Sequence, residues 1–158
     1  MSAQSKKHYF LKTLLPWATK VELATGFPAL LILTHAALET GWNPTGFANN
    51  LFGIKDLPWD AGLAYASTKE YIDGQEQRIR DAFEDFTSPL DSMICYVILI
   101  KHSKRYQKAW EYAINHEYEQ YFEELQRAGY ATDPKFAYKL KRVLKSVRKG
   151  LEELQKEG

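Results

Sequence analysis

The sequence has a single cysteine, no long hydrophobic run and almost no net charge. With only Cys95 among 158 residues, an intrachain disulfide is excluded, so the fold must rest on its hydrophobic core. No apolar run approaches the ~20 residues that cross a bilayer, so we expect no membrane insertion. The 21 basic residues are offset by 20 acidic ones, whereas nucleic-acid-binding domains are usually strongly basic. We therefore expect no nucleic acid among the partners.

The chain also lacks a recognisable secretory signal and any linker rich in Ser, Gly or Pro. Residues 1–15 mix Tyr, Lys and Thr among apolar residues, whereas a signal needs roughly 7–15 consecutive apolar residues and a small-residue cleavage site. Without repeats or linkers, residues 1–158 are expected to form a single domain. A composition of 45% hydrophobic residues, with 4 Trp, 10 Tyr and 8 Phe, excludes a disordered chain.

Periodicity and turn signals predict a mostly helical α+β domain with one small β-hairpin. Residues 28–40 are apolar almost all round, which is typical of a helix at the centre of a core, and Gly41 ends them. Asp73-Gly74 between two alternating segments is typical of a two-residue hairpin turn. Spacing and capping signals predict further helices: before Gly26, over 89–101, 106–113 and 118–128, and after Pro134.

Glu39 is the carboxylate that fits its surroundings least. It lies in the last turn of the apolar segment 28–40, where it meets the negative end of the helix dipole. Both this position and the apolar neighbours should disfavour the ionised form. A carboxylic acid that keeps its proton is the group needed to protonate a leaving glycosidic oxygen. The alternative is that Glu39 simply faces solvent at the end of a helix.

Aromatic and amide side chains follow Glu39 directly in the chain. Trp42, Phe52 and Trp59 are interspersed with three asparagines, among them Asn50. Flat aromatic faces and amide groups suit sugar rings, which present apolar C–H faces ringed by hydroxyl and acetamido groups. The alternative for each aromatic side chain is a place in a minor core under a long loop.

Three motifs, in order along the chain, carry a resemblance to a known family. They are HAALETGW at 35–42 with NNLFGIK at 49–55, then TKEY at 68–71, then GYATDPKFAYKL at 129–140. This pattern resembles the bacterial N-acetylglucosaminidases of glycoside hydrolase family 73, which are peptidoglycan hydrolases and include autolysins and a flagellar rod-associated enzyme. The resemblance implies a lysozyme-like fold, in which a glycan cleft lies between a helical lobe and a small β-hairpin lobe.

The resemblance also implies roles for individual residues. Glu39 matches the general acid of the family, and Glu70 matches a second acidic residue that is often assigned to the catalytic pair. Tyr130 matches a tyrosine associated with the active site. The alternatives are a surface carboxylate for Glu70 and a packing residue for Tyr130. Substrate contacts are expected from five residues: Trp42, Asn50, Phe52, Lys55 and Trp59. No metal and no cofactor is expected.

The chain departs from the family pattern near its motifs. Thr34-His35 stand where Ala-Gln is common, and Phe136 stands where Tyr is often found. After the hairpin the chain reads Phe83-Glu84-Asp85-Phe86, where the family often has FRxY. Because His35 precedes Glu39 by four residues, the two share a helix face, and His35 could hydrogen-bond the carboxyl group. A buried structural histidine is the alternative.

The expected reaction is hydrolysis of the β-1,4 bond after N-acetylglucosamine in peptidoglycan glycan strands. We expect a monomer that acts on the cell wall, in the periplasm or outside the cell, and that is exported by a holin, by a specialised route or within a larger secreted protein. The alternatives are a muramidase or lytic transglycosylase that cleaves the other glycan bond, and a non-catalytic wall-binding or secretion-apparatus scaffold. Inverting, retaining and substrate-assisted mechanisms all remain open.

The last predicted helix carries a run of positive charge. Between Pro134 and Leu151 there is no acidic residue and there are seven basic ones: Lys135, Lys139, Lys141, Arg142, Lys145, Arg148 and Lys149. Such a run is usually a solvated face. The alternative is attraction to an anionic polymer, and peptidoglycan is one.

Overall fold

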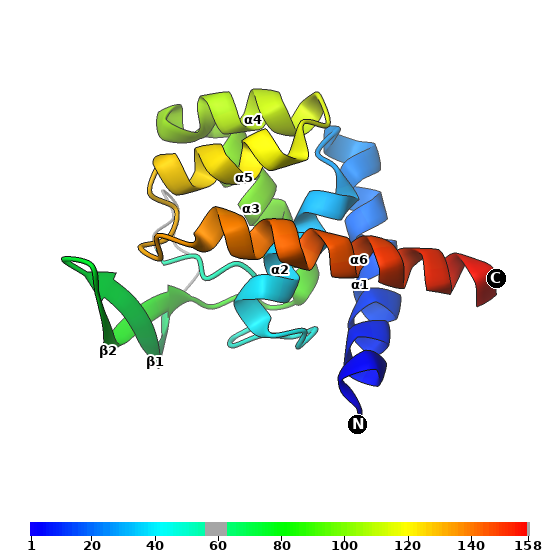
Figure 1. Ribbon diagram of the computed structural model, residues 1–158, viewed down its shortest axis with the longest axis horizontal. Helices are drawn as coiled ribbons and strands as arrows, with labels where there is room; N and C mark the ends of the chain where they lie inside the picture. The colour runs from blue at the N-terminus through cyan, green and yellow to red at the C-terminus, as the bar shows by residue number, and fades with distance from the viewer. Residues whose placement is uncertain (56–62, 158) are drawn as a thin grey trace.

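The computed structural model describes residues 1–55 and 63–157, with the backbone alone for 63–72 and 77–82. Most of the described chain is helical, and two strands form a small separate lobe (Figure 1). The elements are α1 (Ala3–Thr25), α2 (Ala29–Thr40), β1 (Leu63–Ile72), β2 (Gln75–Glu84), α3 (Pro89–His102), the 3-10 helix η1 (Lys104–Tyr106), α4 (Gln107–Ile114), α5 (Tyr118–Arg127) and α6 (Phe136–Glu157). The predicted α+β class, mostly α with one hairpin, is confirmed.

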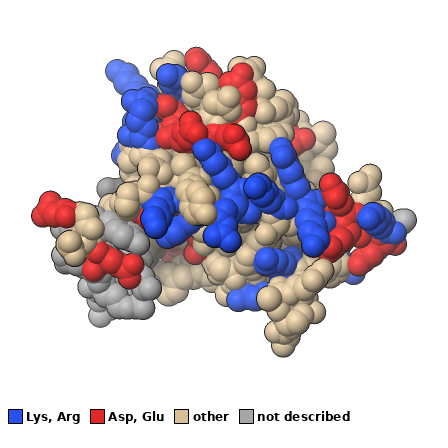
Figure 2. All heavy atoms as spheres, in the orientation of Figure 1, with Lys and Arg blue, Asp and Glu red and all other residues tan. Residues whose placement is uncertain are grey.

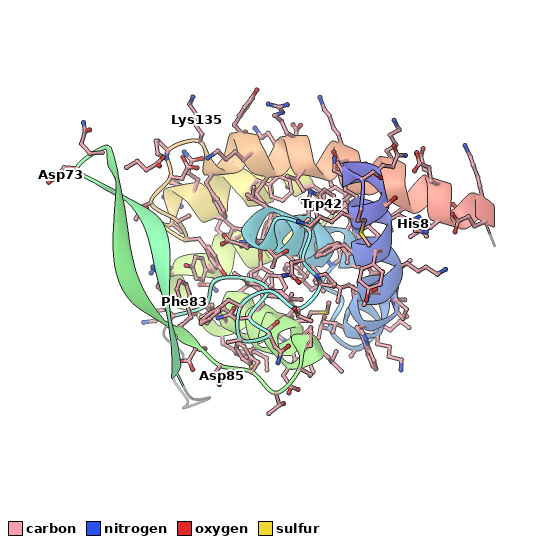
Figure 3. All side chains as sticks on the ribbon, turned by 90° about the horizontal axis from the view of Figure 1, so that it is seen from below. His8, Trp42, Asp73, Phe83, Asp85 and Lys135 are labelled. Carbon is pink, nitrogen blue, oxygen red and sulfur yellow. The ribbon has the colours of Figure 1, made fainter. Side chains whose placement is uncertain are left out.

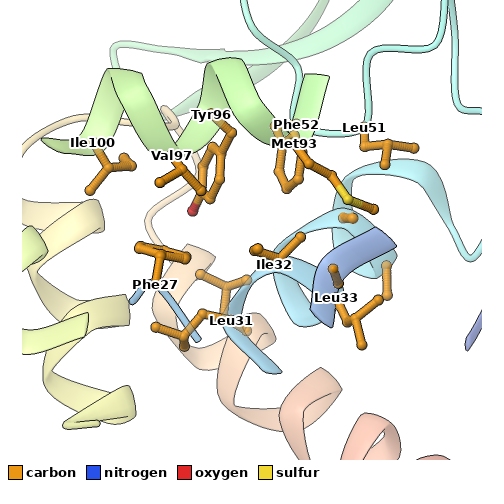
Figure 4. Close-up of a cluster of buried hydrophobic side chains, with 14 of the residues drawn as sticks. Phe27, Leu31, Ile32, Leu33, Leu51, Phe52, Met93, Tyr96, Val97 and Ile100 are labelled. Atoms are coloured by element: carbon orange, nitrogen blue, oxygen red, sulfur yellow. The ribbon is translucent and has the colours of Figure 1, made fainter. Parts of the chain in front are cut away.

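Helix α2 is the centre of the core, as its apolar sequence predicts. Every residue from Leu31 to Ala37 is buried, and the helix packs against α1 and α6. Figure 4 shows Ile32 and Leu33 of α2 below Met93 and Tyr96 of α3. Gly41 ends α2 in the left-handed conformation, with φ 61°, and its N–H donates to the carbonyl of Ala37. Glu39 is thereby held at the end of a rigid, buried helix.

The β-hairpin projects from the helical body (Figure 1). Its strands are antiparallel, with Leu63 opposite Glu84 at one end and Ile72 opposite Gln75 at the other. Asp73 and Gly74 form the turn, both with positive φ, as in the two-residue turns that match strand twist. Asp73 lies at the far tip of the hairpin and Phe83 near the body (Figure 3).

Helix α6 lies across the helical body and packs against three other helices. It contacts α1, α2 and α5. Its buried residues are spaced three or four apart, so one face packs and the other faces outward: Phe136, Ala137, Leu140, Leu144 and Val147 are buried. Gly150 allows a close approach to α1, because a Cβ atom there would overlap the side chain of Leu11. Among the described residues, none of the helices has the length and apolar character of a membrane span.

Candidate active site

A cleft of about 780 Å³ lies between the helical body and the hairpin. Helix α2 contributes Glu39, strand β2 contributes Glu76 and Phe83, and the first turn of α6 contributes Phe136 and Lys139. The remaining lining residues come from connecting segments and helix ends: Leu38, Phe52, Gly53, Ile54, Lys55, Leu99, Ser103, Arg105, Tyr106, Gly129, Tyr130, Ala131, Thr132 and Asp133. The cleft therefore brings the first and third sequence motifs to one place.

Glu39 faces this cleft with a largely covered side chain that is 28% exposed. Gly53 lies directly against its carboxyl group, because a Cβ atom on Gly53 would be 3.1 Å from Glu39 Oε2. Gly53 also has a φ of 65°, a conformation that glycine adopts without steric cost. A glycine at this point thus lets the backbone close over the acid without displacing it.

His35 lies one helical turn before Glu39 and points at it from the interior. The imidazole is fully buried, and its Nε2 is 3.5 Å from Glu39 Oε1. Its Nδ1 lies 2.6 Å from the hydroxyl oxygen of Tyr96, which in turn lies 2.5 Å from that of Tyr121. His35 is therefore a buried structural residue whose ring also lies next to the carboxyl group of Glu39.

Tyr130 lines the cleft beside this group. Its hydroxyl donates to the backbone carbonyl of Phe52 at 2.7 Å, and its ring centroid is 4.7 Å from that of His35. Burial and the charge of Glu39 raise the pKa of Tyr130 well above its ordinary value, so the phenol stays neutral. The hydroxyl joins the GYATDP segment to the loop that carries Gly53.

The side chain of Asn50 is buried and forms hydrogen bonds with backbone groups. Its Nδ2 donates to the carbonyls of Ile54 at 2.8 Å and Glu84 at 3.1 Å. Its Oδ1 accepts the N–H groups of Phe52 at 3.3 Å and Ile54 at 3.1 Å. These four hydrogen bonds use both N–H groups of the amide and both lone pairs of its oxygen. Asn50 therefore shapes the loop, and its side chain has no hydrogen-bonding group left for a substrate.

Trp42 and Phe52, the two predicted aromatic contacts that the structure describes, pack against other aromatic rings. The ring of Phe52 is fully buried and stacks on Tyr96 with centroids 4.1 Å apart, so Phe52 borders the cleft without exposing its ring face. Trp42 packs edge-on against Phe10 of α1, with ring centroids 5.5 Å apart. It lies on the α1 side of the molecule (Figure 3) and is not one of the described residues that line the cleft.

Of the remaining predicted site residues, the structure describes Lys55 in full and Glu70 by its backbone alone. Lys55 lines the cleft, with its Nζ 5.4 Å from the ring centroid of Phe83. The backbone of Glu70 pairs with Gln77 in the hairpin, but its side chain lies outside the described residues. Trp59 lies wholly outside them.

Sequence reasoning missed Arg105 and the Asp133–Lys139 pair, which also line the cleft. The Arg105 guanidinium donates to the carbonyl of Ala128, which places it at the GYATDP segment. Burial alone would raise the pKa of Asp133, but the Lys139 ammonium and a backbone N–H lower it. The sequence offers no motif for Arg105, because it comes from the short segment between α3 and α4. Asp133 stands within the GYATDP motif and could have been found there.

The mostly helical body, the small hairpin and the acid-bearing cleft between them define a lysozyme-like glycoside hydrolase domain. Residues 15–149 match the glucosaminidase family, described as mannosyl-glycoprotein endo-beta-N-acetylglucosaminidase. The chain belongs to this family, which confirms the resemblance carried by the three motifs.

Named relatives and solved structures agree with this assignment. The chain is 38% identical over 147 residues to the peptidoglycan hydrolase FlgJ of Pseudomonas aeruginosa, covering 88% of this chain and 36% of that protein. The chain thus spans about a third of that relative. A peptidoglycan hydrolase mutant from Sphingomonas sp. A1 superposes with a TM-score of 0.79 at 33% identity, covering 92% of this chain and 99% of that one. The glycoside hydrolase domain of FlgJ from Salmonella typhimurium gives a TM-score of 0.69 at 30% identity, covering 99% and 95%.

Proposed function

We propose that this chain hydrolyses peptidoglycan at the β-1,4 bond after N-acetylglucosamine, leaving N-acetylglucosamine at the new reducing end. Glu39, a mostly covered glutamate at the end of a buried helix, faces the cleft between the two lobes. The relatives that share this fold at 30% identity or more are named peptidoglycan hydrolases, which points to cell-wall glycan as the substrate class.

Glu39 is the general acid of this reaction. Its proton passes to the bridging oxygen as the glycosidic bond breaks, and positive charge develops on the sugar ring. Gly53 and His35 lie on either side of the carboxyl group, so its position is set before substrate binds. A fixed acid needs little reorganisation in the transition state.

Tyr130 and Glu70 are the proposed partners of Glu39. Tyr130 presents a neutral ring and hydroxyl at the cleft wall, where it can orient the acetamido group of the substrate. Glu70, carried by strand β1 of the hairpin lobe, either activates water or stabilises the charge on the ring. Lys55 contacts substrate at the hairpin side of the cleft.

The proposed site of action is the cell wall, in the periplasm or outside the cell. A family member that cleaves wall glycan must meet its polymer there.

Substitution of Glu39 by glutamine tests the assignment. The amide keeps the size and hydrogen-bonding reach of the acid but cannot donate a catalytic proton, so we expect a folded protein whose turnover of purified cell walls falls to background. Thermal unfolding of the variant controls for folding. Turnover near the wild-type rate would refute the role of Glu39.

Substitution of Glu70 by glutamine addresses the second carboxyl group. A general base is usually worth a hundredfold or more in rate. A loss below about tenfold would exclude Glu70 as general base and favour nucleophilic participation by the substrate's own acetamido group. A larger loss in a folded variant would support Glu70 as base or charge stabiliser.

A further inference from the structure

A chain of hydrogen-bonded side chains runs from His35, which lies next to Glu39, into the core. His35 Nε2 is 3.5 Å from Glu39 Oε1, and His35 Nδ1 continues to the hydroxyls of Tyr96 and Tyr121. His35, Tyr96 and Tyr121 are all fully buried. Burial raises the pKa of both tyrosines well above the ordinary value, so each hydroxyl keeps its proton and can donate it in a hydrogen bond.

The direction of hydrogen bonding along this chain decides which imidazole nitrogen carries the ring proton. A neutral imidazole has one donor and one acceptor nitrogen. When Tyr121 donates to Tyr96, the Tyr96 hydroxyl donates to His35 Nδ1, and the ring proton then resides on Nε2. In the described part of the chain, Nε2 has no hydrogen-bond partner, since 3.5 Å to Glu39 exceeds a normal N–H···O distance. A buried donor without a partner costs free energy in the resting protein. A partner gained during the reaction therefore lowers the energy of the transition state relative to that of the ground state.

We propose that His35 is a positioning residue for Glu39 and gives its Nε2–H to the carboxylate that remains after proton transfer. The proton of Glu39 goes to the leaving oxygen, and His35 makes a new hydrogen bond without changing its own protonation. Such a bond is stronger to the charged carboxylate than to the acid, so it stabilises the state that the reaction is forming. This proposal rests on the proposed role of Glu39.

Three variants separate positioning from packing. His35→Leu keeps the apolar volume and removes the donor, whereas His35→Gln keeps an N–H donor of similar reach. Tyr96→Phe leaves His35 in place and removes the hydroxyl that holds its tautomer. Tyr118→Phe is the matched control, because it also removes a tyrosine hydroxyl from a histidine, His116 Nδ1 at 3.0 Å, on the exposed surface.

The readouts are kcat and KM on solubilised glycan strands, with thermal unfolding measured in parallel. For His35→Leu we expect kcat to fall about tenfold to a hundredfold, the usual worth of a hydrogen bond to a charged group, with KM within about twofold. For His35→Gln we expect kcat within about threefold of wild type. Tyr96→Phe should lose about threefold to tenfold, and Tyr118→Phe nothing.

Equal kcat losses in the folded leucine and glutamine variants would overturn the proposal, and so would a change in KM alone. If His35→Leu does not fold, an unchanged kcat in Tyr96→Phe overturns it equally well. Failure of the proposed function has a different signature, because Glu39→Gln would then stay active whatever the His35 variants do.

A second, independent observation concerns the outward face of α6. Figure 2 shows Lys and Arg side chains gathered in a band along this helix. The exposed members of the band are Lys135, just before α6, and Arg142, Lys145, Arg148 and Lys149 within it. Lys141 pairs with Glu123, but Lys145 and Lys149 form no ion pair with any side chain that the structure describes. The band therefore retains positive charge although the whole chain carries only +1.

The band begins at the cleft. Phe136 and Lys139, in the first turn of α6, line the cleft, and the exposed basic residues continue along the helix from there. From Phe136 to Lys149 the helix rises about 20 Å, at ~1.5 Å per residue. A polymer that occupies the cleft can thus extend along α6.

We infer that this band binds the carboxylates of peptide stems on the same glycan substrate. The inference rests on the proposed function and on charge complementarity, since each stem is anionic and each exposed residue of the band is cationic. Surface charges of this kind attract a polyanion in a salt-dependent way.

The test measures binding of catalytically inactive Glu39→Gln protein to insoluble peptidoglycan across a salt series. In that background, Lys145→Glu with Lys149→Glu should weaken binding at low salt at least about fivefold and flatten the salt dependence. Lys12→Glu with Lys20→Glu on α1 gives the same change in net charge and serves as the control. Glycan stripped of its peptide stems should bind both double variants equally. Equal losses in the control, or an undiminished effect on stripped glycan, would overturn the inference.

Discussion

Replacing Asn50 by alanine tests whether this residue supports the loop or contacts the substrate. The substitution removes four hydrogen bonds to backbone groups. The carbonyl of Ile54 still accepts a hydrogen bond from the N–H of Glu84 at 2.8 Å. The N–H groups of Phe52 and Ile54, however, lose the Asn50 Oδ1 atom to which they donate. Two buried donors are then unsatisfied.

The expected loss of stability follows from these two groups. An unsatisfied buried donor costs about 1–3 kcal/mol, so the pair gives about 2–6 kcal/mol. Because water can enter a loop more easily than a helix, we expect about 3 kcal/mol in chemical denaturation. A chain of this size shifts its Tm by about 2–4 °C per kcal/mol, so Tm should fall by about 6–12 °C.

The matched control is Asn43→Ala in the same loop. Asn43 is exposed, and its Oδ1 accepts the backbone N–H of Thr45 at 3.1 Å. This substitution should cost less than about 1 kcal/mol. An Asn50→Ala variant of nearly unchanged stability with a raised KM would show instead that the amide is a substrate ligand.

Three further predictions concern the tyrosines and Gly53. Tyr130→Phe removes one partly buried hydrogen bond and should lower the free energy of unfolding by about 1 kcal/mol in denaturant titrations; an unchanged value would contradict the bond. The pKa values of Tyr96, Tyr121 and Tyr130 are raised in the folded state, so their contribution to stability is complete below about pH 10, where unfolded tyrosine ionises, and is lost above it. Denaturation as a function of pH should show a steeper alkaline decline for wild type than for Tyr96→Phe, and equal slopes would count against it. Gly53→Ala combines a left-handed backbone with a Cβ atom 3.1 Å from Glu39 Oε2, so steady-state kinetics should show a lower kcat, and wild-type kcat would contradict the contact.

The features that local sequence determines were predicted well. Residues 29–40 form a buried helix because almost every side chain there is apolar, and Asp73-Gly74 forms the turn because both residues tolerate positive φ. Glu39 could be singled out because a carboxylate at the end of such a helix is unusual. Its place in the cleft agrees with that prediction.

The contacts that depend on distant parts of the chain were not predictable. Asn50 resembles a sugar ligand in sequence, but its partner Glu84 lies 34 residues later and returns through the hairpin. Trp42 follows Glu39 closely, but a φ of 67° turns the chain toward Phe10 of α1. The hydroxyl of Tyr96 reaches His35 across 61 residues, and no local pattern indicates that pairing.

The reducing-end sugar released from peptidoglycan shows which glycan bond the protein cleaves and whether Glu39 is needed. Purified cell walls would be digested with the wild-type protein and, in parallel, with Glu39→Gln, and the reduced products identified by mass spectrometry. We expect products that end in N-acetylglucosamine from the wild type and none above background from the variant. Products that end in N-acetylmuramic acid or its anhydro form, or equal release by both proteins, would contradict it.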